Sequence, residues 1–253
     1  MGKYFQVEVK PTVPNVAAGQ HAAFADNDLV FDWFAFDLPK GASKLLNIAL
    51  EIRPKGDSGS TPNEFDLDLL FAKTHKGVAP PSIGTVNSAA FASAVNLSNH
   101  MVQFYPSGNF GVFEAHLDST AFTQGSGAGK SLPGYLFQGE PDSGTNVGYD
   151  RFYVAGIAAG ALDFRSETLI NNGDLNGPIM TVNGTDPRLF MSIGDTVNVT
   201  TTADTSVSKS MGVIKSMTGA SITLESAFTT GDVVHQDIVY NTTPIRILLD
   251  FEK

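Results

Sequence analysis

The sequence predicts an all-β protein, a jelly-roll-like sandwich with an inserted or appended small β-barrel module. Short apolar runs alternate with polar residues at the two-residue period of strands. The 25 glycines and 13 prolines are spread along the chain, which favours many turns over one linker. Phenylalanine, a residue that suits sheets, is the main aromatic with 18 copies. The 253 residues suffice for one large β domain or two smaller ones.

The first quarter of the chain reads as a series of strands. Residues 3–10 alternate between apolar and polar side chains, and Pro11 ends the run because proline cannot donate to a sheet. The aromatic run 29–38 is a second strand. The periodicity of 45–53 fits a helix or a strand, and its short length between turn signals favours a strand. Residues 65–73 alternate as a half-buried antiparallel strand does.

The middle of the chain is less regular. The Ala- and Ser-rich segment 86–97 is predicted to form a short helix. Residues 101–105 and 110–117 are predicted to pair as a hairpin, and 135–138 is a further strand. The small residues within 151–164 predict a strand that a neighbouring backbone approaches closely, or a bulge.

The composition of the sequence changes near residues 166–178. Aromatic residues become rare there, and Thr, Ser, Val, Ile and Gly dominate. Residues 191–234 contain short apolar runs cut by Gly-Asp and Thr-Gly-Ala turns, the pattern of a small barrel. Residues 244–252 return to the alternation of apolar and polar residues seen in the first part of the chain. We therefore expect a sandwich of residues 1–165 plus 243–253, with a small barrel in 166–242. The final strand should pair in the N-terminal sheet.

Charge and composition bear on the class of partner. The formal net charge of −10, with lysine and arginine scattered singly, argues against nucleic-acid binding. The absence of cysteine excludes disulfides, thiolate metal sites and cysteine nucleophiles. No apolar stretch approaches the roughly 18 residues that span a bilayer, so no membrane association is expected.

One segment, 124–131, nearly matches the phosphate-binding loop G-x-x-x-x-G-K-[ST]. Gln124 replaces its first glycine. Pro133 and Gly134 follow almost at once and would break the helix that the motif requires. A surface loop is therefore expected, and no cofactor is predicted.

Acidic side chains offer few candidates for chemistry. The loops 57–60 and 142–150 are rich in oxygen ligands but do not match the EF-hand pattern, so polar turns are expected, with calcium at 142–150 left open. Asp66, Asp68 and Glu114 are the acids to inspect for acid–base work, although a solvated strand face explains the aspartates. No catalytic, cofactor-binding or metal-ligating residue is assigned.

Histidines and aromatic residues allow two further possibilities. The five histidines, which have no metal-ligand spacing, are His21, His75, His100, His116 and His235. A zinc site would need their assembly in space. Four aromatic residues, Phe31, Trp33, Phe34 and Phe36, could form a sugar-binding platform, but core packing is the stronger interpretation.

The small-module stretch resembles β-modules inserted in capsid-associated and decoration proteins of tailed bacteriophages. The resemblance rests on Ser192-Ile-Gly-Asp-Thr-Val-Asn-Val and Gly212-Val-Ile-Lys-Ser-Met-Thr-Gly-Ala-Ser-Ile-Thr-Leu, and it covers about 45 residues. It implies a non-enzymatic virion protein on the capsid surface, with the major capsid protein or other virion proteins as partners. By analogy it also implies a homo-oligomer, with a trimer favoured. It does not separate the capsid from a neck, tail or fibre position.

Two alternatives remain open. A carbohydrate- or receptor-binding sandwich would expose Trp33 in a groove, whereas a structural protein would bury it. A glycan-acting enzyme, the weaker alternative, would place two acids across a cleft from each other.

Overall fold

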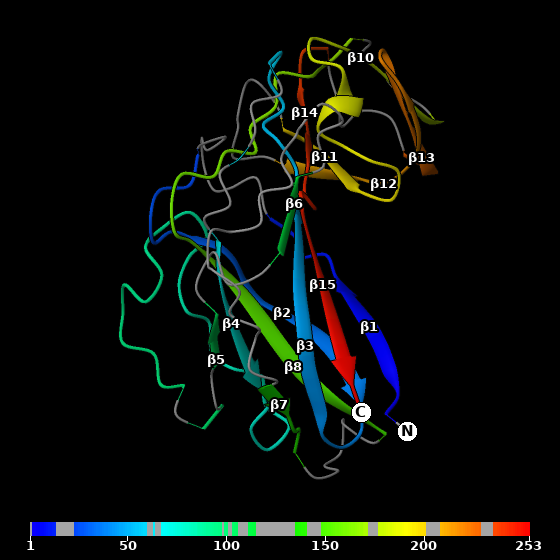
Figure 1. Ribbon diagram of the computed structural model, residues 1–253. Coiled ribbons are helices and arrows are strands. Elements are labelled where there is room, and N and C mark those ends of the chain that lie inside the picture. The colour runs from blue at the N-terminus through cyan, green and yellow to red at the C-terminus, as the bar shows by residue number, and fades with distance from the viewer. Residues whose placement is uncertain are drawn as a thin grey trace.

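A computed structural model shows a β-sandwich with a small β-barrel at one end (Figure 1). The structure describes residues 2–13, 23–59, 63, 67–97, 99–100, 103–105, 111–114, 135–140, 148–171, 177–200, 208–228 and 235–253. Within them, the only helix is the 3₁₀ turn η1 (Pro187–Leu189). No described helix has the length and apolar character needed to cross a bilayer. The predicted all-β class is confirmed.

Two sheets form the sandwich, and each is named here in its spatial order. The first contains β1 (Tyr4–Val9), β15 (Ile245–Glu252), β3 (Ser43–Ile52) and β6 (Gly111–Glu114), with the short β7 (Tyr135–Phe137) also paired to β3. The second contains β2 (Leu29–Pro39), β8 (Tyr149–Ala158), β4 (Leu67–Lys73) and β5 (Gln103–Tyr105).

This strand order is that of a jelly roll. The eight strands of the sandwich are counted here along the chain, with β7 set aside. In the first sheet, the first strand pairs with the last, the last with the third, and the third with the sixth. The second strand lies beside the seventh, followed by the fourth and fifth. An eight-stranded jelly roll has this arrangement of two interlocked Greek keys. One feature departs from it, because β6 pairs with β3 in a parallel direction.

The barrel is inserted between β8 and β15, the last two strands of the jelly roll. It closes in the order β10-β13-β12-β11-β14-β9. Its strands are β9 (Leu169–Ile170), β10 (Gly177–Asn183), β11 (Thr196–Thr200), β12 (Ser208–Thr218), β13 (Ser221–Phe228) and β14 (Ile238–Asn241). Sandwich and barrel each enclose a separate cluster of buried apolar side chains. The termini lie together at the end of the sandwich away from the barrel (Figure 1).

The C-terminal strand behaves as the sequence predicts. β15 pairs with β1 on one side and β3 on the other, antiparallel to both. Its side chains alternate strictly between buried and half-buried, with Ile245, Ile247, Leu249 and Phe251 in the core. This strand therefore carries the chain from the barrel back into the centre of the first sheet.

The predicted helix at 86–97 is wrong. Asn87 and Phe91 have φ values of 58° and 57°, a left-handed conformation that interrupts a right-handed helix. The backbone groups bond to the start of β2 instead: the Asn87 amide donates to the Leu29 carbonyl, and the Leu29 amide donates to the Ser88 carbonyl. These tertiary hydrogen bonds replace the local ones that a helix would make.

The predicted hairpin of 101–105 and 110–117 is also wrong. β5 pairs with β4 in the second sheet, whereas β6 pairs with β3 in the first. The chain thus crosses between the sheets where the sequence predicts a turn within one. Strand lengths and turn residues alone do not distinguish these two connections.

The small residues of 151–164 have a clear structural reason. Phe31 lies opposite Gly156 in the register of β2 and β8, and this register shifts on both sides of Phe31. A Cβ atom at position 156 would lie 2.2 Å from Cε1 of the Phe31 ring. The extra residues at these register shifts lie on β2, so the bulge predicted within 151–164 is wrong. The group that approaches Gly156 is an aromatic ring rather than a backbone.

Backbone hydrogen bonds hold the two segments that connect the sandwich to the barrel. The Arg53 amide donates to the Pro244 carbonyl at 2.8 Å, where β3 ends and β15 is about to begin. The Gly56 amide donates to Arg165, and the Glu167 amide donates back to Gly56. A Cβ atom on Gly56 would lie 2.9 Å from the Phe190 ring, so the polar loop after β3 packs closely on the barrel.

Candidate functional site

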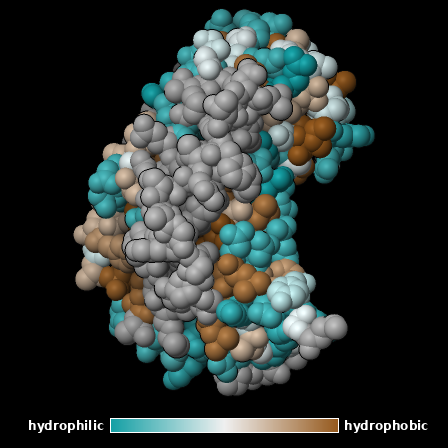
Figure 2. Space-filling view, viewed as in Figure 1, coloured by the Kyte–Doolittle hydropathy of each residue, from teal (hydrophilic) through white to brown (hydrophobic). Residues whose placement is uncertain are grey.

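The surface is hollowed where the barrel meets the sandwich (Figure 2). A groove of about 510 Å³ is lined there by residues of both parts, and we call it the junction groove. Its lining consists of Glu51, Arg53, Arg188, Met191, Ser192, Ile193, Met217 and Arg246. β3 and β15 supply the sandwich side, whereas η1, the following turn and β12 supply the barrel side.

A chain of ion pairs forms the floor of the junction groove. Arg53 Nε lies 3.3 Å from Asp195 Oδ2, and Arg53 Nη1 lies 2.9 Å from Glu51 Oε1. Glu51 Oε2 in turn lies 3.1 Å from Nη1 of Arg246, which is directly opposite in the β3–β15 register. Arg246 Nε then reaches Glu8 on β1 at 2.6 Å. The chain of charges thus crosses three strands and ends at Asp195, in the turn before β11.

Asp195 is the buried end of this chain, with 2% of its surface exposed. Its Oδ2 atom accepts hydrogen bonds from the Ser192 amide at 2.9 Å and from Asn241 Nδ2 at 2.8 Å. Burial raises the pKa of Asp195, and the opposing attraction of Arg53 and these hydrogen bonds does not fully offset the rise. The ionised form of Asp195 therefore depends strongly on Arg53, which is itself only 6% exposed.

The Gly-Asp turn noted in the sequence orients two side chains in opposite directions. The Ser192 amide bonds the Asp195 carboxylate across the turn, and Gly194 takes a φ of 89° that favours glycine. Asp195 is thereby directed into the protein, whereas Ile193 is 65% exposed at the groove. The same turn thus buries the charged side chain of Asp195 and exposes the apolar side chain of Ile193.

The rim of the junction groove is held by Arg188. Its Nε and Nη2 atoms donate to both oxygens of Asp186, at distances from 2.6 to 3.1 Å. Asp186 also accepts from the Arg188 amide and so caps η1. The guanidinium is fixed in place although the side chain is 57% exposed.

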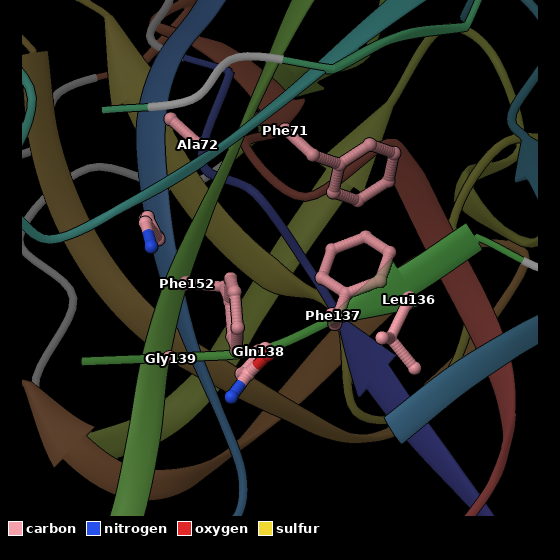
Figure 3. A pocket seen from close by; sticks show the side chains of 8 residues that line it. Phe71, Ala72, Leu136, Phe137, Gln138, Gly139 and Phe152 are labelled. Atoms are coloured by element: carbon pink, nitrogen blue, oxygen red, sulfur yellow. The ribbon is translucent and has the colours of Figure 1, made fainter. Parts of the chain in front are cut away.

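A second hollow, of about 430 Å³, lies beside β7 and β4. Figure 3 shows the rings of Phe71, Phe137 and Phe152 grouped there, with Leu136 pointing away from them. These rings are 1%, 2% and 4% exposed. Phe137 packs edge-on against Phe71 and Phe152 with centroid distances of 5.6 and 5.1 Å. The rings therefore contact one another as part of the core and have almost no surface that a ligand could contact.

The aromatic residues considered as a sugar-binding platform are largely core. Phe31 and Phe36 are 2% and 6% exposed, and Phe34 packs partly against the same cluster, so the packing interpretation is confirmed for this group. Trp33 is half-buried. Its indole N–H donates to the Pro81 carbonyl at 2.9 Å, which ties the ring to the loop before Ile83.

This contact supports a stability prediction for Trp33. The change Trp33→Phe is expected to lower the free energy of unfolding by about 1 kcal/mol, because it removes one hydrogen bond and some packing. Urea unfolding followed by circular dichroism measures this loss. Trp33 is the only tryptophan, so wild-type fluorescence also reports on this place alone. Unchanged stability together with a saturable fluorescence shift on adding glycans would favour the carbohydrate-binding alternative.

The acids singled out in the sequence do not converge in the described part of the chain. Asp68 lies half-buried on β4, and Asp57 pairs with Lys55 at 3.5 Å. Asp150 is 2% exposed and pairs with Lys40 at 2.9 Å, while the amides of Gly41 and Gly139 donate to its other oxygen. Asp150 is therefore a structural anchor. Asp66, loop residues 142–146 and the Glu114 side chain lie outside the description.

The histidines are partly brought together. The rings of His75 and His100 meet edge to face with centroids 6.2 Å apart, and the Nδ1 of His100 bonds the Lys73 carbonyl. His235 is exposed. Among the described residues, no three His, Asp or Glu side chains are grouped as metal ligands. His21, His116 and the loop 124–131 lie outside the described residues.

Sequence reasoning missed Arg53, Arg188 and Arg246 as members of one site. They are separated by more than 50 residues along the chain, and the register of β15 against β3, together with the packing of the barrel, brings them together. Of the residues at this site, only Asp195 was marked by a sequence pattern, the Gly-Asp turn.

In comparisons with known proteins, no family model and no curated protein matches the chain.

Proposed function

We propose that the protein is a non-enzymatic structural protein of a tailed-bacteriophage virion, which decorates or cements the capsid surface as a homo-oligomer. The observation that carries the proposal is the jelly-roll strand order with a barrel inserted between its last two strands. Jelly rolls are a recurrent architecture of viral capsid proteins, although lectins and cupins share it. The resemblance of the barrel segment to capsid-associated modules adds the second line of support.

The junction groove supports a docking role. It combines exposed apolar and charged side chains on a base of fixed ion pairs, as a pre-organised binding surface does. A protein that binds only the assembled shell stabilises it by mass action. In this proposal the chain contributes contact area between capsid subunits and performs no reaction.

Shell stability tests the proposal. Shells assembled without the protein are mixed with increasing amounts of it, and the temperature of their disruption is followed by light scattering. We expect this temperature to rise and to saturate at a fixed ratio of protein to capsid subunit. Failure of the purified protein to sediment with shells at any ratio would contradict the proposal.

A further inference from the structure

β1 lies at the edge of the first sheet and has one unpaired side (Figure 1). Among the described residues it pairs only with β15, in an unbroken antiparallel register. Lys3, just before β1, exchanges both backbone hydrogen bonds with Lys253. Because successive residues of a strand direct their backbone groups to opposite sides, those of Tyr4, Gln6 and Glu8 point away from β15. This row of backbone donors and acceptors can pair with a further strand.

The other edges carry features that oppose such pairing. The barrel is closed and therefore has no edge. β5, β6 and β7 are only three or four residues long. β2, at the edge of the second sheet, has two register shifts against β8 and ends at Pro39. Short edges, bulges and proline all block edge-to-edge association, and β1 has none of the three.

The one charged side chain of β1 does not block a neighbouring strand either. Glu8 lies 2.6 Å from Arg246 Nε and 3.6 Å from Lys10 Nζ, so its charge is already compensated. Its side chain is on the outer face of the sheet, with the exposed Tyr4 and Gln6. Charge protects an edge best when it points inward, and no charge of β1 does so.

The inner face of β1 is incompletely covered. Phe5 and Val7 pack against the sandwich core but keep part of their surface exposed. Their neighbours on β15, Phe251 and Leu249, are fully buried. Phe5 stacks on Phe251 with ring centroids 5.5 Å apart. The exposure therefore follows the free side of β1, where a neighbouring strand would cover it.

The sequence of β1 complements itself. When two copies pair antiparallel with Gln6 opposite Gln6, Tyr4 of each copy lies opposite Glu8 of the other. This register uses all three residues whose backbone groups point outward, and it forms about six hydrogen bonds between the copies. A register centred on Glu8 would instead set two carboxylates opposite each other. A two-fold contact occupies both free edges, so association stops at two chains.

We propose that two copies of this chain associate through β1 and so join their first sheets into one continuous sheet. The inference rests on the proposed function in that it names the contact within the homo-oligomer. One pair of short strands buries less area than a standard interface of about 1,600 Å², so the dimer dissociates on dilution. A strand of another protein is the competing occupant, and it would leave the chain monomeric in solution.

Sedimentation velocity of the whole protein over a range of concentrations measures the association. We expect the mean mass to rise with concentration to twice that of one chain and no further. Gln6→Pro removes the N–H that faces the partner and leaves the bonds of Phe5 and Val7 to β15 in place, so it should weaken dimerisation at least about tenfold. Gln6→Ala keeps this N–H and should leave dimerisation unchanged. Circular dichroism checks that each variant is folded.

The absence of cysteine allows a test of the register. The Cα atoms of the two Gln6 residues should lie about 5.5 Å apart, within the range of a disulfide. Gln6→Cys should therefore form a disulfide-linked dimer on mild oxidation. The Cα atoms of the two Tyr4 residues should lie about 14 Å apart, and Ile179 is 55% exposed on the barrel, so Tyr4→Cys and Ile179→Cys should not cross-link.

Three results would overturn the inference: a monomer at every concentration, equal dimerisation of Gln6→Pro and wild type, or equal cross-linking of the three cysteine variants. Its failure is distinguishable from failure of the proposed function. If the protein is monomeric but sediments with shells, the β1 contact is absent and the decorating role stands. If the protein dimerises as described but does not bind shells, the β1 contact stands without the capsid.

Discussion

Replacing Arg53 with methionine is expected to lower the free energy of unfolding by about 3 kcal/mol at neutral pH. Arg53 and Asp195 are 6% and 2% exposed, and their side chains join the sandwich to the barrel. Removing one partner of a buried ion pair leaves the other charge without compensation, which typically costs about 3–5 kcal/mol. Chemical denaturation followed by circular dichroism at pH 7 measures the effect.

The loss should depend on pH in a defined direction. Burial raises the pKa of Asp195, and removal of Arg53 raises it further. A carboxyl whose pKa is raised by folding stabilises the fold when protonated, and that contribution is lost as pH rises through the folded-state pKa. The difference between wild type and Arg53→Met should therefore be largest at neutral pH and shrink as pH falls towards the ordinary carboxyl pKa of about 4.

Other carboxyl groups do not reverse this trend. Folding lowers the pKa values of Glu140, Asp163 and Asp186, so these groups lose stabilising energy on acidification in both proteins and cancel in the difference. Adding Asp195→Asn to Arg53→Met should recover part of the stability, because it removes the orphaned charge. Arg246→Met is the comparison variant, since Arg246 is half-exposed and should cost about 1 kcal/mol. A loss for Arg53→Met that is no larger than this, or that grows on acidification, contradicts the account.

Gly156→Val is expected to lower the free energy of unfolding by about 3 kcal/mol. A Cβ atom there would lie 2.2 and 2.6 Å from two carbons of the Phe31 ring. Phe31 is 2% exposed in the sandwich core, so the ring has no open space into which to move. Overpacking of a close-packed core typically costs about 1–3 kcal/mol, and this contact lies at the severe end.

A double-mutant cycle identifies the cause. Gly156→Ala is combined with Phe31→Leu, which removes the aromatic atoms nearest to the new methyl group. We expect the double variant to be more stable than the sum of the two single effects implies, because the clash is then absent. Additive losses would show that Gly156 is required for a reason other than the Phe31 ring.

Much of the fold is predictable because strands with one buried face repeat at period two. Residues 244–252 alternate between apolar and polar side chains as the N-terminal strands do, and this pattern correctly predicted that β15 pairs in the first sheet. The helix prediction at 86–97 failed because backbone hydrogen bonds to Leu29 outweigh the helix preference of alanine. The hairpin prediction failed because β5 and β6 belong to different sheets, and local sequence does not encode that choice.

The candidate site is less predictable than the fold. Arg53 directly follows β3 and Arg246 lies on β15. Only the register that sets Arg246 opposite Glu51 shows that the two share a surface. Arg188 joins them because the barrel packs on the loop after β3 through Gly56 and Phe190. A groove formed between an inserted module and its host therefore leaves almost no trace in the local sequence pattern.

Cryo-electron microscopy of the particle that carries this protein tests the central claim most directly. We expect a jelly roll with its inserted barrel on the outer surface of the shell, in contact with a capsid subunit. Density for this fold at a neck, tail or fibre position, or no density for it on the shell, would contradict the proposal.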